Sequence, residues 1–426
     1  MMWFFALWFA LLVLGMPLAF TLVVPSVLYL IVTGHGLDFA TQRMIGGLNS
    51  FPLLAVPFFI LTAQLMNASG VSERIFDFAR TLVGHIRGGL GHVNVLASLL
   101  FSGMSGSAVA DAGGLGQLEV RAMRAGGYDD DFSGSVTAAS AIIGPLIPPS
   151  IPFVVYGVVA NASIGGLFLG GIGPGLLSTA VMMAVVYLIA RRRGYPTDTR
   201  ASWSAAGAAF LRALLPLLTP GIIIGGIFGG WFSPTEASVV AATYALVLGL
   251  AVYREIGSTG MIQVLRETVN NTATIGLIVA GVSLFGYVIA LEQVPQKIST
   301  FFLGLSDNPL VFLLIVNLLL LFLGTFIEAL AILLLVVPVL VPAALKLGID
   351  PIHFGVLTVF NLMIGILTPP MGVALFVVAK VTNIPFMVLA RGIVPFVIPL
   401  IGVLILMILF PPIVTAIPHF FLGSGQ

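Results

Sequence analysis

The sequence contains no cysteine and very little charge. Only 8% of its 426 residues are charged and 59% are hydrophobic, whereas a soluble domain carries roughly 25% charged residues. This composition excludes a soluble globular protein. Without cysteine the chain has no disulfides, thiolate metal sites or cysteine nucleophile. The formal net charge is +1, with no basic block or aromatic-interleaved Lys/Arg patch, so nucleic acid is not an expected partner.

The hydrophobic residues form long continuous runs. At about 20 apolar residues per bilayer crossing, the chain length corresponds to roughly ten to twelve crossings. The segment 1–15 lacks a positively charged region and a small-residue cleavage site, and therefore reads as an uncleaved first span rather than a signal peptide. The sequence predicts an all-α polytopic membrane protein.

The positions of the Lys and Arg residues predict the topology. We interpret the apolar stretches 90–117 and 309–345 as re-entrant hairpins, each of which enters and leaves the membrane on the same side. With this interpretation, 14 of the 17 Lys and Arg residues lie on one side of the membrane. By the positive-inside rule this side is cytoplasmic. The stretch 3–32 contains Pro17 and Pro25 and is either one broken helix or a tight pair. The other predicted spans are 51–68, 132–158, 169–190, 213–232, 237–253, 272–291, 354–379 and 390–412.

An internal repeat relates the two halves of the chain by an offset of 221 positions. Gly144 and the doublet Pro148–Pro149 correspond to Gly365 and Pro369–Pro370. The charge pattern starts the first copy outside and the second inside, so the copies are inverted. Inverted repeats with interrupted helices are typical of secondary transporters with a site at the membrane midplane. The alternative is a composition effect, since the chain holds 49 Gly and 26 Pro.

Breaks in the spans are the candidate binding positions, because hydrocarbon cannot solvate freed backbone groups. The hairpin tips 102–108 and 324–328 offer hydroxyls, helix-end carbonyls for a cation and N-terminal amides for an anion. The breaks 144–150 and 365–372 add further oxygens, which hard cations such as Na⁺ prefer. Two facing copies suit one anion flanked by two ions. The alternatives are close helix packing for the tip serines and packing kinks for the proline doublets.

Three carboxylates stand out in the apolar runs. Asp111 and Glu328 are predicted at membrane depth, where a charge is a functional hypothesis by default. For Asp111, a structural bond to a hairpin amide and a contact with an ion are both open. For Glu328, which lies nearer its hairpin tip, a functional role is the favoured interpretation. Glu236, in the S-P-T-E segment 233–236, is predicted to close a capping box. The segment 71–88 is predicted to be an amphipathic interfacial helix, with an ordinary loop as the alternative.

Five motifs together resemble the large membrane subunit of tripartite ATP-independent periplasmic (TRAP) transporters, over nearly the whole chain. They are F-S-G-M-S-G-S-A-V-A-D at 101–111, I-P-P-S at 147–150, G-G-W-F-S-P-T-E-A-S at 229–238, L-G-T-F-I-E at 323–328 and L-T-P-P-M-G at 367–372. The resemblance implies a permease of the bacterial inner membrane, an elevator mechanism driven by Na⁺, and neither enzyme activity nor an organic cofactor. It also implies a separate small four-span subunit and a periplasmic binding protein that delivers an organic anion, commonly a carboxylate.

The resemblance and the breaks together give the predicted site residues. The predicted Na⁺-binding residues are Ser102, Gly103, Ser105, Gly144, Pro148, Gly324, Thr325, Gly365, Thr368 and Met371. The predicted substrate-binding residues are Ser107, Ser140, Pro149, Ser150, Glu328, Asn361, Pro369, Pro370 and Gly372. Two departures from the family pattern leave ligand details open: Glu328 stands where Asp is commoner, and Met104 interrupts a small-residue run.

The predicted domain division follows the repeat. It assigns 1–89 to scaffold spans and a first connector helix, 90–168 to the first half of a transport domain, 169–308 to scaffold with a cytoplasmic linker 191–212 and a second connector, 309–385 to the second transport half, and 386–426 to a C-terminal scaffold span.

Two other functions compete with this hypothesis. A stand-alone elevator transporter of another family would take its anion directly from solution. The G-M-S-G segment 103–106 also matches intramembrane serine proteases, which need a histidine base within reach of the serine. The sequence does not identify the anion, the Na⁺ stoichiometry or any proton coupling.

Overall fold

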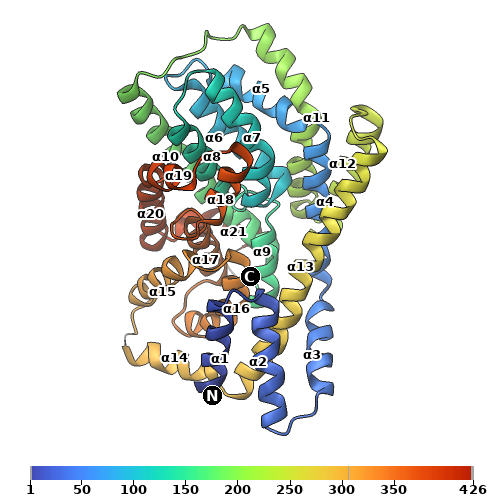
Figure 1. Ribbon diagram of the computed structural model, residues 1–426, viewed down its shortest axis with the longest axis vertical. Helices are drawn as coiled ribbons and strands as arrows, with labels where there is room; N and C mark the ends of the chain where they lie inside the picture. The colour runs from blue at the N-terminus through green and yellow to red at the C-terminus, as the bar shows by residue number, and fades with distance from the viewer. Residues whose placement is uncertain (1, 306, 424–426) are drawn as a thin grey trace.

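The computed structural model describes residues 2–305 and 307–423; residues 1, 306 and 424–426, which the predicted division included, lie outside the described residues. The described residues form helices and no strands (Figure 1), which confirms the all-α polytopic fold. Six of these helices are long and apolar enough to cross a membrane, or seven if the pair bent by 48° near the C-terminus counts as one. This is fewer than the crossings expected from composition, because much of the apolar sequence forms half-length helices.

One group of helices, called the scaffold body here, contains the long helix α13. Its members are α1 (Met2–Val13), α2 (Leu18–Val32), α3 (Asp38–Leu48), η1 (Phe51–Leu54), α4 (Ala55–Ala68), α11 (Trp203–Phe228), α12 (Pro234–Val247) with η3 (Leu248–Val252), and α13 (Ser258–Leu291). Helix α13 packs on α2, α3 and α4, and α4 packs on α12. The open question about residues 3–32 is answered as a tight pair, since α1 and α2 are separate helices in contact.

Both predicted hairpins are present. The first consists of α6 (Gly89–Ser105) and α7 (Ala108–Ala125), and the second of α15 (Pro309–Gly324) and α16 (Ala329–Lys346). In each hairpin the two helices pack on one another. Both stretches therefore fold back at a short tip instead of running on as one straight helix.

Both predicted interruptions are present as well. The first separates α8 (Asp130–Ser140) and η2 (Ala141–Ile143) from α9 (Ile151–Ala160), and the second separates α17 (Pro351–Gly365) from α18 (Val373–Thr382). In sequence each break contains one Pro-Pro doublet, and both doublets contain a cis peptide bond. The repeated sequence motif thus has the same backbone form in the two halves.

Two helices connect the groups. Helix α5 (Val71–Val83) buries Val71, Ile75 and Ala79, a spacing of four residues that forms one apolar stripe. It packs on α6 and α11, so the predicted amphipathic helix is confirmed, although it ends before residue 88. Its counterpart α14 (Val294–Leu305) packs on α16 and α13.

The remaining helices differ from the predicted division. Helices α10 (Ile164–Arg193), α19 (Phe386–Gly392), α20 (Val394–Leu409) and α21 (Pro412–Leu422) were assigned largely to the scaffold, but α10 packs on α6, α17, α20 and α21, and α20 packs on α10 and α17. We group them with the hairpins and interrupted helices as the hairpin body. The predicted linker 191–212 is also shorter, because α10 continues to Arg193 and Ser202 caps α11.

The two bodies meet through small residues at closely approaching helices. A Cβ placed on Gly103 of α6 would lie 2.7 Å from Pro220 Cβ of α11, and one placed on Gly114 of α7 would lie 2.8 Å from Asn67 Oδ1 of α4. At these two positions the helices of the two bodies approach too closely to leave room for a side chain.

The predicted topology has a direct test. The α10–α11 connection and α14 lie at opposite ends of the molecule (Figure 1). Because the chain has no cysteine, Arg192→Cys and Asn308→Cys each introduce a single thiol. We expect an impermeant thiol reagent to label Arg192→Cys from the cytoplasmic face and Asn308→Cys from the opposite face. Labelling of both from one face would contradict the topology.

Candidate functional site

The first hairpin tip lies against the first break. Ser105 Oγ donates a hydrogen bond to Asp111 Oδ1, and a Cβ on Gly144 would collide with Asp111 Oδ2. The Asp111 side chain is buried, and its Oδ2 atom has no hydrogen-bond partner within the described residues. A buried carboxylate oxygen without a partner is costly. The Ser105 hydroxyl, the Asp111 carboxylate and the Gly144 backbone therefore lie together, with one carboxylate oxygen unpartnered among the described residues; this group is called the Asp111 pocket here.

The second hairpin tip meets the second break in a similar way. A Cβ on Gly365 would lie 2.8 Å from Gly324 Cα, so the two backbones touch. The Met371 backbone N–H donates to the Thr325 carbonyl at 3.1 Å, and the Thr368 N–H donates to the Gly365 carbonyl at 2.9 Å. All five residues predicted to bind Na⁺ in this half are thus brought together. They supply mainly backbone oxygens.

Buried amides tie each hairpin to its interrupted helix. Asn94 of α6 donates to Thr137 Oγ1 at 2.6 Å and accepts from Ser140 Oγ at 2.7 Å. In the other half, Asn361 donates to both the backbone oxygen and Oδ1 of Asn317 at 2.8 Å. Ser140 and Asn361 are separated by the repeat offset, 361 − 140 = 221. These two predicted substrate residues therefore brace the fold within their own halves.

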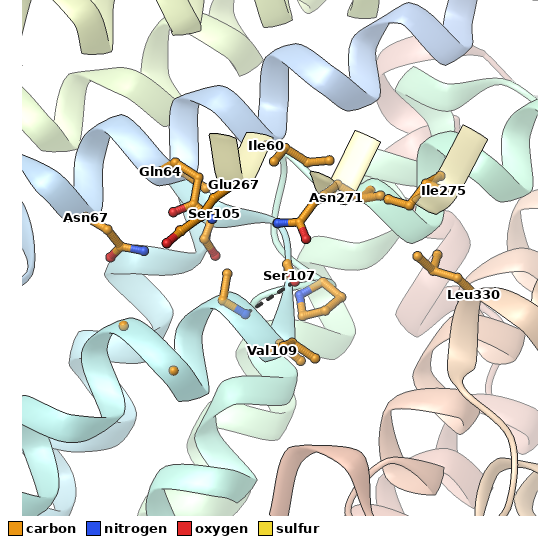
Figure 2. A pocket seen from close by; sticks show the side chains of 18 of the residues that line it. Ile60, Gln64, Asn67, Ser105, Ser107, Val109, Glu267, Asn271, Ile275 and Leu330 are labelled. Carbon is orange, nitrogen blue, oxygen red and sulfur yellow. Dashed lines mark hydrogen bonds between the residues drawn. The ribbon is translucent and has the colours of Figure 1, made fainter. Parts of the chain in front are cut away.

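A cavity of about 710 Å³ lies between the two bodies and is lined by residues of both hairpin tips (Figure 2). From the first tip it is lined by Ser105 and Ser107, and from the second by Glu328. Ser107 caps α7, accepting a hydrogen bond from the Ala110 N–H at 3.4 Å, and α16 begins directly after Glu328. Two helix N-termini, which favour anions, therefore border one cavity.

The opposite wall of the cavity belongs to the scaffold body and was missed in the sequence. Gln64 and Asn67 of α4 line it together with Gln263, Glu267 and Asn271 of α13 (Figure 2). Gln263 Nε2 donates to Glu267 Oε1 at 2.9 Å. The last three residues recur every four positions, which is the signal that places them on one helix face.

The charges around the cavity have one sign. No Lys, Arg or His is among the described lining residues, and the ionisable ones are Glu267 and Glu328. An anionic solute in this space meets no cationic side chain. The helix N-termini that border the cavity favour negative charge.

Other predicted residues lie at the first hairpin tip or at the breaks and do not line this cavity. Ser150 caps α9 and donates to the Pro145 carbonyl at 2.5 Å, and Ser102 donates to the Leu99 carbonyl at 2.5 Å. Gly103 faces Pro220 of the scaffold body. Five further residues at the breaks do not line the cavity either. They are the buried Pro148 and Pro149, the exposed Pro369 and Pro370, and Gly372, which adopts a positive φ of 51°.

Two smaller predictions concern Ser105 and Glu236. The Ser105 hydroxyl donates to a carboxylate, instead of to the histidine base that the protease alternative requires. Glu236 accepts from the Ser233 backbone N–H at 2.7 Å, and the Ser233 side chain caps the Glu236 N–H. The capping box at the start of α12 is confirmed.

Comparison with known proteins decides the family. Residues 5–413 match the family described as "Tripartite ATP-independent periplasmic transporter, DctM component". The chain belongs to the TRAP transporter large-permease family. The resemblance found in the motifs is therefore confirmed, and the protein is a multi-pass transport protein of the bacterial inner membrane, not an enzyme.

Individual relatives cover nearly all of this TRAP permease. The sialic acid TRAP transporter large permease SiaM of Vibrio cholerae is 58% identical over 98% of both chains. The sialic acid TRAP permease SiaT of Haemophilus influenzae is 50% identical over 97% of this chain and 67% of its own length. The crystal structure of the Alcanivorax borkumensis YdaH transporter superposes with a TM-score of 0.63 at 17% identity, covering 88% of this chain and 89% of that one. That last likeness concerns the fold alone.

Proposed function

We propose that this TRAP permease carries sialic acid, or a closely similar carboxylated sugar, across the inner membrane by coupling its import to Na⁺. The substrate class is supported by the 58% identity to a sialic acid permease over 98% of both chains. The observation that carries the proposal is the cavity bounded by both hairpin tips and free of cationic side chains among its described lining residues.

The charge balance of this cavity supports the proposed Na⁺ coupling. A carboxylate substrate brings a negative charge next to Glu267 and Glu328. Na⁺ at the Asp111 pocket and at the Gly324–Gly365 contact would place one cation behind each hairpin tip. Each cation would lower the electrostatic cost of the anion, and the anion would in turn favour binding of the cations.

An elevator movement fits the division into two bodies. The hairpins and interrupted helices pack among themselves, and they meet the scaffold body at glycines such as Gly103 and Gly114. Sliding the hairpin body along α4, α11 and α13 would carry the tips, the ions and the substrate together. Such rigid-body alternation around a site is the usual mode of inverted-repeat transporters.

The proposed partners are a small membrane subunit and a periplasmic binding protein. Proteoliposomes containing this chain with its small subunit should accumulate labelled sialic acid only with an inward Na⁺ gradient and the binding protein present. We expect uptake to fall to background when K⁺ replaces Na⁺. Full-rate uptake by this chain alone, without either partner, would contradict the proposal and favour a stand-alone transporter.

A further inference from the structure

A second cavity lies on the hairpin body, at the end where the basic residues of α10 gather. Its volume is about 570 Å³, and it is formed where α8, α10, α19 and α20 meet. Ser135 of α8 donates to the Leu389 carbonyl at 3.4 Å, which fixes α19 on α8. This cavity shares no lining residue with the transport cavity.

Three arginines line the second cavity, and two of them are uncompensated. Arg193 is held by Asp131 at 2.8 Å and by Asp129 at 3.1 Å. Arg192 and Arg391 make no ion pair with any described residue and are exposed. Two guanidinium groups from different helices therefore face one space, and the carboxylate among its described lining residues, that of Asp131, is paired with Arg193. Two such guanidinium groups suit a phosphate group, which guanidinium binds through two hydrogen bonds.

Apart from Gly392 and from Asp131, which pairs with Arg193, the rest of the lining is apolar and leads towards the lipid-facing surface. Phe132, Ile189, Met387, Val388 and Pro395 complete the cavity wall. Along the helices that continue from it, Leu188 of α10 is 57% exposed and Ile398 of α20 is 63% exposed. Figure 1 shows α10, α19 and α20 at the outer edge of the molecule, on the side away from α13.

We propose that this cavity binds an anionic phospholipid of the cytoplasmic leaflet. Arg192 and Arg391 hold the headgroup phosphate, and the acyl chains lie along the exposed faces of α10 and α20. A free phosphate ion would satisfy the arginines but would leave the apolar wall unused. Basic pockets between membrane helices on the cytoplasmic side are suited to such headgroups.

The location of the cavity gives the lipid a mechanical consequence. All four helices that form the cavity belong to the hairpin body. A lipid bound there travels with that body and does not anchor the scaffold body. Its headgroup must stay in the cytoplasmic interface, so binding favours positions of the hairpin body that keep α19 at that interface.

The test measures lipid binding to the purified transporter complex in neutral detergent. Dioleoylphosphatidylglycerol, dioleoylphosphatidylcholine and inorganic phosphate are titrated separately, and bound lipid is counted by native mass spectrometry alongside the melting temperature. We expect phosphatidylglycerol to bind and to raise the melting temperature, and phosphatidylcholine and phosphate to do neither. The double variant Arg192→Gln/Arg391→Gln should bind phosphatidylglycerol about 25-fold more weakly, roughly fivefold for each arginine.

The matched control is Arg191→Gln, which removes an exposed arginine from the same helix turn outside the cavity lining. It should keep phosphatidylglycerol binding within about twofold. An equal loss in the control would show general surface attraction and overturn the proposal, as would full binding by the double variant. A thermal shift from phosphate equal to that from phosphatidylglycerol would also overturn it, in favour of a soluble-anion site. Equal melting temperatures of all variants without added lipid exclude misfolding.

Discussion

Asp111→Asn should nearly abolish Na⁺-driven uptake while leaving the protein folded. The substitution keeps the side-chain volume but removes the charge, and one carboxylate oxygen becomes an N–H donor that repels a cation. Interactions with a charged group contribute about 1.5–3 kcal/mol, which corresponds to roughly 10–100-fold in affinity. We expect the Na⁺ concentration for half-maximal uptake in proteoliposomes to rise by at least about tenfold.

Two further variants calibrate this result. Ser105→Ala removes the hydroxyl that orients Asp111 and should shift Na⁺ dependence in the same direction, by less. Glu119→Gln alters another buried carboxylate of α7, two turns further from the tip, and should leave Na⁺ activation near that of the unmodified protein. Unchanged Na⁺ activation in Asp111→Asn would remove Asp111 from the ion site.

Gly365→Ala and Gly324→Ala should each eliminate transport. An added methyl group would lie 2.8 Å from Gly324 Cα in the first variant and 3.0 Å from Gly365 Cα in the second. Both obstacles are backbone atoms, which side-chain rotation cannot relieve. Overpacking of this kind costs about 1–3 kcal/mol of stability. To remove the clash, the backbone of the hairpin tip has to move away from the backbone of the break. The oxygens of both segments then no longer converge on one ion.

The measurement is Na⁺-dependent uptake with a melting curve for each variant. Gly402→Ala, on α20, is the control, because a Cβ there meets nothing within 4 Å and alanine favours a helix over glycine. It should transport normally. Normal transport by both Gly365→Ala and Gly324→Ala would show that the contact between tip and break is not needed.

The interrupted architecture was predictable because its signals are local. Gly and Pro residues that cluster inside an apolar run free backbone groups that lipid cannot solvate. The breaks at 144–150 and 365–372 and the tips near Ser105 and Gly324 could therefore be located in the sequence. The internal repeat supported each predicted break, because the equivalent position in the other copy has a similar sequence. For Asp111 the sequence left open a structural bond to a hairpin amide, whereas the structure shows the Ser105 hydroxyl donating to Asp111 and one Asp111 oxygen beside Gly144 without a partner among the described residues.

The division into bodies was only partly predictable. Helix α10 is apolar along most of its length, and its packing against α17 depends on glycines such as Gly170, where a Cβ would lie 3.0 Å from Ile352 Cγ2. Glycines occur throughout the chain, and the sequence does not indicate which helix packs against each of them. The predicted division therefore placed α10 and α20 with the scaffold, whereas their contacts are with the hairpins and interrupted helices.

The sequence by itself determined the helical membrane fold, the inverted repeat and the four breaks, because composition, charge placement and Gly/Pro interruptions act locally. Only the tertiary structure decided which breaks meet, that Gln64 and Glu267 of the scaffold body face the hairpin tips, and that Arg192 and Arg391 share a cavity. The reason is physical: in lipid almost any apolar helix face is compatible with burial or exposure. Which faces meet therefore depends on shape complementarity between distant segments, which no local pattern records.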